Sequence, residues 1–461
     1  MNRSKKLLIL VGVLLAGCAA TFGVLQYQEK QEQIKNSGET ILAIPTDTVT
    51  ALSWEYEDTA LAFHKGDRWL YDEDEAFPVS EDAINTQLAQ FENFAAAFII
   101  EDVEDYGQYG LDKPICTIHL TADETEYTIS LGNYSNLDSQ RYVDIGDGNV
   151  YLMVNDPLDV FDTTIREMIE HDAIPAALKD AATIQFAGAE NYSIVYEEDS
   201  PNTYCADDVF FAQQEGKSLP LDTSKVNSYL STITGLNPTN YVTYNATEEE
   251  IRSYGLDDPE LTIVVKYTTK DENKQNVEES FTLYVSRDPE KVAEADEDDE
   301  LAGYVRVGES KVIYEVSSSN YKKLMAVAYD DLRHRLVFSG SFEDVTQVDV
   351  SLEGATYTLT SEEKDDERTF FYQEEELEID DFESALRLLT ADSFTSEKPT
   401  QKKEIELIVH LDNENYPQVK IELYRYDGSN CLAVVDGESV SLVPRSEVVE
   451  LIEAVNAIIL N

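Results

Sequence analysis

The sequence predicts an α+β protein made of tandem repeated modules, each an antiparallel sheet with helices packed to one side, plus an N-terminal anchor helix. Three observations support this prediction. The segment Tyr109-Gly110-Leu111-Asp112-Lys113-Pro114 recurs as Tyr254-Gly255-Leu256-Asp257-Asp258-Pro259, and an apolar run follows both copies. Short runs rich in β-branched and aromatic residues, separated by Gly and Asp turns, alternate with amphipathic helical stretches. An uncharged, mostly apolar stretch lies near the N-terminus.

The duplication extends to both sides of the repeated segment, in the same order along the chain. Upstream, Phe77-Pro78-Val79-Ser80 corresponds to Leu219-Pro220-Leu221-Asp222, and downstream residues 142–147 correspond to 304–309. A third, divergent copy begins near Val345 and lacks the repeated segment, as terminal repeats are often atypical. We therefore expect repeats at residues 41–165, 180–330 and 336–461, in line with about 150 residues per domain in a chain of 461.

The N-terminus predicts where the protein lies. A basic tail, residues 1–6, precedes the apolar stretch 7–25, which approaches the length of a membrane-spanning helix, and residues 26–40 form a polar juxtamembrane linker. With the basic residues on the cytoplasmic side, the modules would be extracytoplasmic in a single-pass membrane protein.

Two alternatives to this anchor helix remain open. Leu15-Ala16-Gly17-Cys18 has the form of a lipobox, in which Cys18 would be lipidated after cleavage. The apolar run that continues to Leu25 favours an uncleaved helix instead, because a lipoprotein usually begins with a polar tether. The second alternative is a secretory signal that is removed. All three interpretations put the modules outside the cytoplasm.

Each module is expected to begin with short strands and a helix. The strands are expected at residues 49–56, 60–64 and 68–71 in the first copy and at 183–186, 192–196 and 209–212 in the second. Ser80 and Asp222 are natural N-caps of the helices that follow, whose apolar residues recur at spacings of three and four. Thr247 and Glu250 have the spacing of a capping box, which predicts a short helical turn before the second repeated segment.

The repeated segment is expected to lead into an antiparallel sheet. In the first copy, strands are expected at residues 115–120, 127–131, 142–145 and 150–154. Gly146-Asp147-Gly148-Asn149 joins the last two as a tight hairpin, and Asp436-Gly437 does the same in the third copy. Short helices at residues 157–161, 320–325 and 446–458 close the three modules, and the third also contains strands at 345–352 and 355–360 and a helix at 382–389. Strands in hairpins with helices to one side describe α+β modules.

The repeated segment itself allows a structural and a functional interpretation. In the structural one, Gly110 and Gly255 permit positive φ, and Pro114 and Pro259 prevent a helix from continuing. Leu111 and Leu256 would then fill the core, while Asp112 and Asp257 would accept local backbone hydrogen bonds. In the functional one, Tyr109, Asp112, Tyr254 and Asp257 would line a ligand groove. The structural interpretation is simpler.

Composition excludes some classes of function. The formal net charge of −58 argues against nucleic acid as a partner, because phosphate binding requires clustered Lys and Arg. Because 42% of the residues are hydrophobic, the acidity does not indicate disorder. Beyond Cys18, the three cysteines Cys116, Cys205 and Cys431 are scattered and show no metal or redox spacing, so neither a metal site nor a disulfide framework is expected.

No catalytic motif is apparent in the sequence. The five histidines, His64, His119, His171, His334 and His410, are dispersed, and no zinc-protease, nucleophile-elbow or phosphate-loop pattern accompanies them. The acidic run at residues 296–300 has the composition to collect Ca²⁺ weakly, although a solvated loop is the simpler interpretation. Paired carboxylates for hydrolysis meet in space rather than in sequence, so they remain an alternative. No cofactor is expected.

These segments resemble a known bacterial family. Several segments are similar to segments of the domain of unknown function DUF4340: an N-terminal anchor, the Tyr-Gly-Leu-Asp-x-Pro turn, Ile129-Ser130-Leu131-Gly132, Arg141-Tyr142-Val143 and Val150-Tyr151. Asp331-Leu332-Arg333 also resembles a segment that often closes that domain. The likeness covers much of the first two modules and fits the third poorly. It implies an anchored envelope protein without an established activity, and an association with the transport machinery of gliding-type ABC exporters.

We expect a membrane-anchored, non-enzymatic binding or scaffold protein that acts through the surfaces of its modules. The expected partners are the membrane, through the anchor, and membrane transport proteins. The alternative is a cell-envelope hydrolase with a carboxylate-based or calcium-dependent site. A cleft that holds two close acids with strongly raised pKa values would favour that alternative.

Overall fold

The computed structural model describes residue 21 and residues 38–460, except for residues 102, 297, 298, 365 and 366. The expected basic tail, nearly all of the anchor stretch and Cys18 lie outside this part of the chain. None of the helices among the described residues is both long enough and apolar enough to cross a membrane. The chain divides into two compact units, the first ending at His171 and the second beginning at Asp172.

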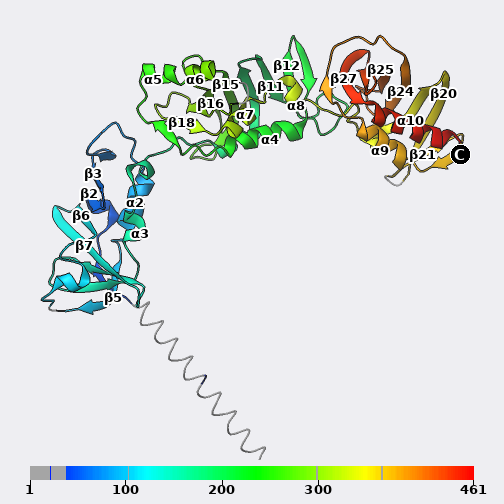
Figure 1. The fold of residues 1–461 in the computed structure, drawn as a ribbon. Coiled ribbons are helices and arrows are strands. Elements are labelled where there is room, and N and C mark those ends of the chain that lie inside the picture. The colour runs from blue at the N-terminus through cyan, green and yellow to red at the C-terminus, as the bar shows by residue number, and fades with distance from the viewer. Residues whose placement is uncertain (1–20, 22–37, 102, 297–298, 365–366, 461) are drawn as a thin grey trace, which may run out of the picture. The chain divides into compact units, whose positions relative to one another are not determined.

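The first unit contains one nine-stranded antiparallel sheet (Figure 1). Its strands are β1 (Glu39–Leu42), β2 (Val49–Tyr56), β3 (Thr59–Lys65), β4 (Trp69–Tyr71), β5 (Phe94–Ile100), β6 (Cys116–Ala122), β7 (Thr125–Ser135), β8 (Gln140–Asp144) and β9 (Val150–Met153), in the order β1-β5-β9-β8-β7-β6-β2-β3-β4. Helices α2 (Glu81–Ala89) and α3 (Leu158–Phe161) cover one face. As predicted, Ser80 caps α2 by accepting a hydrogen bond from the N–H of Ala83. Phe161 packs edge-on against Trp54, with 5.4 Å between the ring centroids.

The second unit begins with another nine-stranded sheet. Its strands are β10 (Ala181–Ala187), β11 (Tyr192–Tyr196), β12 (Phe210–Gln214), β13 (Lys217–Pro220), β14 (Tyr241–Thr243), β15 (Leu261–Lys270), β16 (Asn276–Ser286), β17 (Gly303–Val307) and β18 (Ile313–Val316), in the order β13-β12-β11-β10-β15-β16-β17-β18-β14. Its helices are α4 (Thr223–Thr234), α5 (Glu248–Ser253), α6 (Pro289–Glu294), α7 (Ser318–Met325) and α8 (Tyr329–Leu332). Asp222 caps α4, and Thr247 with Glu250 forms the predicted capping box of α5.

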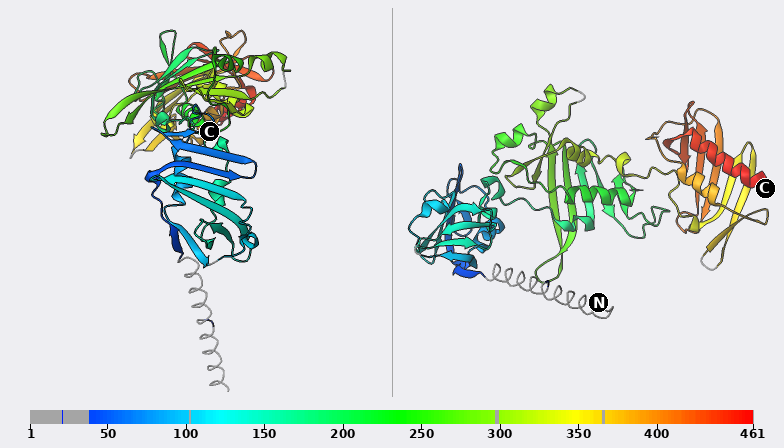
Figure 2. Two further views of the ribbon diagram at one scale, coloured as in Figure 1. Left: turned by 90° about the vertical axis from the view of Figure 1, so that its left-hand side faces the viewer. Right: turned by 60° about the horizontal axis from the view of Figure 1, so that its bottom comes forward.

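A third nine-stranded sheet completes the second unit. Its strands are β19 (Val345–Leu352), β20 (Ala355–Lys364), β21 (Glu367–Tyr372), β22 (Glu375–Leu377), β23 (Ser393–Phe394), β24 (Lys403–Leu411), β25 (Gln418–Arg425), β26 (Asn430–Val435) and β27 (Glu438–Pro444), in the order β22-β21-β20-β19-β24-β25-β26-β27-β23. Helices α9 (Asp380–Leu388) and α10 (Arg445–Leu460) lie side by side on one face of this sheet (Figure 2).

The three sheets share one plan, including a detail that sequence similarity did not reveal. The first long strand of each, β2, β10 or β19, pairs with the next strand of the chain on one side and with β6, β15 or β24 on the other. The latter pairing slips by one residue at the same place in every sheet: after Val49, after Ala181 and after Val345. A short 3-10 turn precedes each of these residues. Such bulges are retained within families, so they support the divergent third copy.

The central strands of each sheet bury one face and leave the other polar, whereas strands farther out, such as β9, β17 and β26, bury residues on both faces. In β24 the buried residues Ile405, Leu407 and Val409 alternate with partly exposed ones, and β2 and β10 show the same alternation. Antiparallel sheets allow this arrangement, because they bury one face in the core and hydrate the other. Each module therefore presents an open, polar area to solvent over its central strands, which we call its open face.

Candidate functional site

The two repeated turns have the backbone geometry that their glycines predict. Gly110 has φ +73° and Gly255 has φ +71°, both in the left-handed region that favours glycine. A Cβ at Gly110 would lie 2.5 Å from Oδ1 of Asn133, and one at Gly255 would lie 2.6 Å from Oγ of Ser286. In both modules the turn therefore packs closely against the end of the second strand after it.

The apolar side chains of the turns also make equivalent contacts. Tyr109 packs on Tyr142 with 4.9 Å between ring centroids, and Tyr254 packs on Tyr304 with 4.5 Å. Leu111 and Leu256 are buried, at 8% and 2% exposure. Each tyrosine thus joins its turn to the third strand of the following sheet segment.

The aspartates differ from the structural interpretation. Asp112 and Asp257 are exposed, and the hydrogen bonds among the described residues do not include one from a backbone N–H to either carboxylate. Backbone bonds close the turns instead, for example from the N–H of Leu111 to the carbonyl of Tyr106. Asp257 forms an exposed ion pair with Arg252 at 3.4 Å. The expectation that these aspartates accept the turn's N–H groups was therefore wrong.

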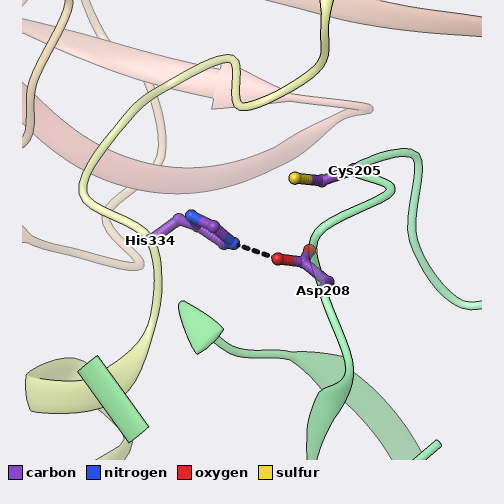
Figure 3. A group of neighbouring side chains, drawn as sticks. All are labelled: Cys205, Asp208 and His334. Carbon is purple, nitrogen blue, oxygen red and sulfur yellow. Dashed lines mark hydrogen bonds and ion pairs between the residues drawn. The ribbon is translucent and has the colours of Figure 1, made fainter. Parts of the chain in front are cut away.

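A more concentrated cluster of functional side chains lies in the second unit, between its two sheets. Sγ of Cys205, a carboxylate oxygen of Asp208 and a ring nitrogen of His334 all lie within 4.8 Å of one another (Figure 3). We call these three residues the junction cluster. Cys205 and Asp208 are on the loop between β11 and β12, and His334 follows α8 on the segment that leads to the third sheet.

Local hydrogen bonds of the β11–β12 loop hold the carboxylate in place. The Oγ1 of Thr203 donates to Oδ2 of Asp208 at 2.7 Å and accepts the N–H of Cys205 at 3.0 Å. The N–H of Asp208 donates to the carbonyl of Cys205 at 3.1 Å. Threonine and aspartate commonly organise tight turns in this way. The remaining oxygen, Oδ1 of Asp208, is 2.7 Å from Nε2 of His334.

The junction cluster is well shielded from water. The side chain of Asp208 is 2% exposed and that of His334 is 21% exposed. Burial, and then the charge of Asp208, raise the pKa of the Cys205 thiol to about 11. The free thiol is therefore protonated at neutral pH, which does not suit it to act as a nucleophile, because the thiolate is the reactive form.

Basic side chains beside the cluster connect the linking segment to the third sheet. The guanidinium of Arg333 lies 3.6 Å from the ring centroid of Phe394 and donates to the carbonyl of Val440 at 2.8 Å. Arg335 donates to the carbonyl of Ala391. Nζ of Lys225, on α4, donates to the carbonyl of Arg333 at 2.9 Å. These contacts stabilise one position of His334 relative to both sheets.

Two hollows border the cluster. One, of about 220 Å³, is lined by Asp208 and His334 together with Arg333 and Phe394. The other, of about 310 Å³, is lined by Cys205 and Asp208 together with acidic and amide side chains of the third module. The buried donors are thus within reach of a small solute.

The sequence did not identify this cluster. Cys205 and Asp208 are three residues apart in a loop, but His334 is 126 positions from Asp208, and only the junction of two modules brings them together. One signal was available, since the loop between β11 and β12 is longer than its counterpart between β3 and β4.

In the acidic run, residues 297 and 298 lie outside the described residues, and Glu300 pairs with Lys322 at 3.0 Å.

These observations define an α+β protein that repeats one antiparallel sheet plan, with its most concentrated donor set at a module junction. A profile of the family described as Domain of unknown function (DUF4340) matches residues 69–209 and 212–407. The chain belongs to this family. The first match begins at β4 and the second within β12, and each ends in the next module. No curated protein matches the chain, and no solved structure does.

Proposed function

We propose that the chain is a membrane-anchored extracytoplasmic protein that binds or braces a partner through the open faces of its sheets and catalyses no reaction. The observation that carries this proposal is the repeated alternation of burial, which leaves a polar area uncovered over the central strands of every module. An uncovered antiparallel sheet is a rigid surface whose side chains are free to contact a partner. Family resemblance supports a component of the membrane transport machinery as that partner.

The open face of the third sheet illustrates the kind of surface that is available. Lys403 pairs with Glu406 and Glu422, and Lys420 pairs with the same two carboxylates. Although burial opposes it, hydrogen bonds from the two lysines lower the pKa of Glu422 to about 2. A carboxylate held in the ionised form is a poor proton donor, so Glu422 favours recognition rather than general acid catalysis.

Site-specific photo-crosslinking in living cells tests the proposal. The photoreactive residue replaces Thr128, Thr268 or Thr360, which are exposed on the open faces of the three sheets. Matched controls carry it at Asn85 of α2 or Ser228 of α4, which are exposed on the covered side. We expect crosslinks to one membrane transport component from open-face positions only. Equal labelling from the helix positions, or hydrolysis of envelope polymers by the purified chain, would contradict the proposal.

A further inference from the structure

We propose that the junction cluster is a Zn²⁺ site, in which the thiolate of Cys205, the carboxylate of Asp208 and Nε2 of His334 bind one ion and clamp the second module to the third. This inference goes beyond the proposed function and does not depend on it. Thiolate, imidazole and carboxylate are the donors that Zn²⁺ takes in proteins. Three protein donors leave a fourth position for water.

The distances are close to those that an ion would impose. The three donor atoms lie within 4.8 Å of one another. With bond lengths of about 2.0 to 2.3 Å, tetrahedral Zn²⁺ holds its ligand atoms about 3.3 to 3.8 Å apart. A pair at that limit would close by about 1 to 1.5 Å, while the Asp208 to His334 hydrogen bond, now 2.7 Å, would open as the ion takes its place. Both shifts are within the reach of side-chain rotation.

A second layer of contacts already orients the carboxylate. Because Thr203 donates to Oδ2 of Asp208, Oδ1 is directed toward Nε2 of His334, where the ion would take the place of their hydrogen bond. Outer hydrogen bonds of this type orient the ligands in metal sites. The N–H of Cys205 donates to the same threonine, which places the thiol and the carboxylate on one side of the loop.

The place of the junction cluster in the repeated module favours a ligand-binding role over a role in packing alone. The loop that carries Cys205 and Asp208 runs between β11 and β12, whereas β3 and β4 are joined by a turn from Lys65 to Trp69. The added loop reaches the segment that leads to the third sheet. Because both hollows border the cluster, an ion has a path to it, which a metal site requires.

Binding must remove one proton from the site. In the free protein, burial keeps the Cys205 thiol protonated. When Zn²⁺ binds, the S–H bond breaks, the sulfur electron pair forms the bond to the metal, and the proton goes to solvent. No oxidant or reductant takes part. The bound ion offsets the charges of the thiolate and of Asp208 in a buried place, where unpaired charges are costly.

Cobalt substitution in the purified full-length chain tests this inference. After treatment with a chelator, the chain is titrated with Co²⁺, and the near-ultraviolet thiolate-to-cobalt charge-transfer band is recorded. We expect saturation at one ion per chain, displacement of Co²⁺ by Zn²⁺, and a higher melting temperature with Zn²⁺. Cys205→Ser should abolish the charge-transfer band, and His334→Gln should weaken cobalt binding by at least tenfold.

The matched control for cobalt binding is a second His–Asp pair, which does not belong to a cluster with a cysteine. Nε2 of His410 lies 2.9 Å from Oδ2 of Asp349 on the open face of the third sheet, so His410→Gln should leave cobalt binding unchanged. Absence of the band in the wild-type chain, its survival in Cys205→Ser, or equal loss in His410→Gln would overturn the inference. The cobalt titration of the wild-type chain tests the proposal by itself, so the test remains valid if one of the variants does not fold.

Discussion

Replacement of Gly110 by alanine tests how the repeated turn is built. At φ +73° an added Cβ costs about 1 to 2 kcal/mol. That Cβ would also lie 2.5 Å from Oδ1 and 2.6 Å from Cγ of Asn133, an exposed side chain that must turn away, so we add about 1 kcal/mol, the low end of the cost of overpacking. We therefore expect Gly110→Ala to lower the free energy of unfolding by about 2 to 3 kcal/mol, as the sum of these two costs.

Gly146→Ala is the matched control. Gly146 has φ +81° and nothing within 4 Å of its added Cβ, so only the backbone cost applies, about 1 to 2 kcal/mol. The double variant Gly110→Ala/Asn133→Ala removes the clashing side chain, and its cost relative to Asn133→Ala should fall to that of the control. This cycle separates backbone strain from steric overlap.

Tryptophan fluorescence during urea unfolding measures these variants in the first unit alone. The chain has two tryptophans, Trp54 and Trp69, and both are buried in the first sheet, on β2 and β4. The midpoint of the fluorescence transition therefore reports the stability of that module. If Gly110→Ala costs no more than Gly146→Ala, or if the Asn133 change gives no relief, the packing argument for the turn is wrong.

Further predictions concern charged contacts. Arg141 and Asp156 form a 2.6 Å ion pair, and their side chains are 8% and 13% exposed. Asp156→Ala should leave the buried guanidinium without its counter-ion and lower the free energy of unfolding by about 3 to 5 kcal/mol, measured by the same fluorescence assay. Asp156→Asn keeps a hydrogen-bond acceptor and should cost less. Lowering of the Glu422 pKa from 4.5 to about 2 means that its stabilising contribution is complete above pH 4.5 and is lost as the pH falls toward 2. Glu422→Gln should therefore melt below wild type at pH 7, and the two melting curves should converge between pH 4.5 and 2; a constant difference would argue against the lysine network. Finally, Arg333→Ala should speed amide hydrogen exchange near Val440, because it removes the hydrogen bond to the carbonyl of Val440 and the contact with Phe394. An exchange rate unchanged from wild type would mean that Arg333 does not join the modules.

Much of the fold was predictable because it depends on local signals. Strands β2, β11 and β19 begin and end where alternation and turn residues predicted, and Ser80 and Asp222 cap their helices as expected. In the hairpin between β26 and β27, Asp436 and Gly437 have φ +50° and +84°, the left-handed geometry that an Asp-Gly step favours.

Other elements were not predictable, for two physical reasons. Edge strands such as β1, β14 and β23 are short, and their pairing depends on a neighbouring strand far along the chain. β5 is an apolar run, Phe94–Ile100, and such a run does not distinguish a strand from a buried helix by its period. The junction cluster was missed for a related reason, since packing of two modules brings His334 to Asp208.

Engineered disulfides test the central claim, that three modules share one strand pairing, most directly. Ser53 faces His119, Gln185 faces Val264, and Asp349 faces Ile408 at equivalent places in the three sheets. Residues directly opposite have Cα atoms about 4.5 to 5.5 Å apart, within reach of a disulfide, whereas diagonal neighbours are too distant.

Mass spectrometry of oxidised double-cysteine variants gives the result. We predict that all three facing pairs form disulfides and that a register-shifted control, Ser53→Cys/Thr117→Cys, does not. Disulfides in the first two pairs without one between β19 and β24 would contradict the third copy, and formation in the shifted control would contradict the pairing itself.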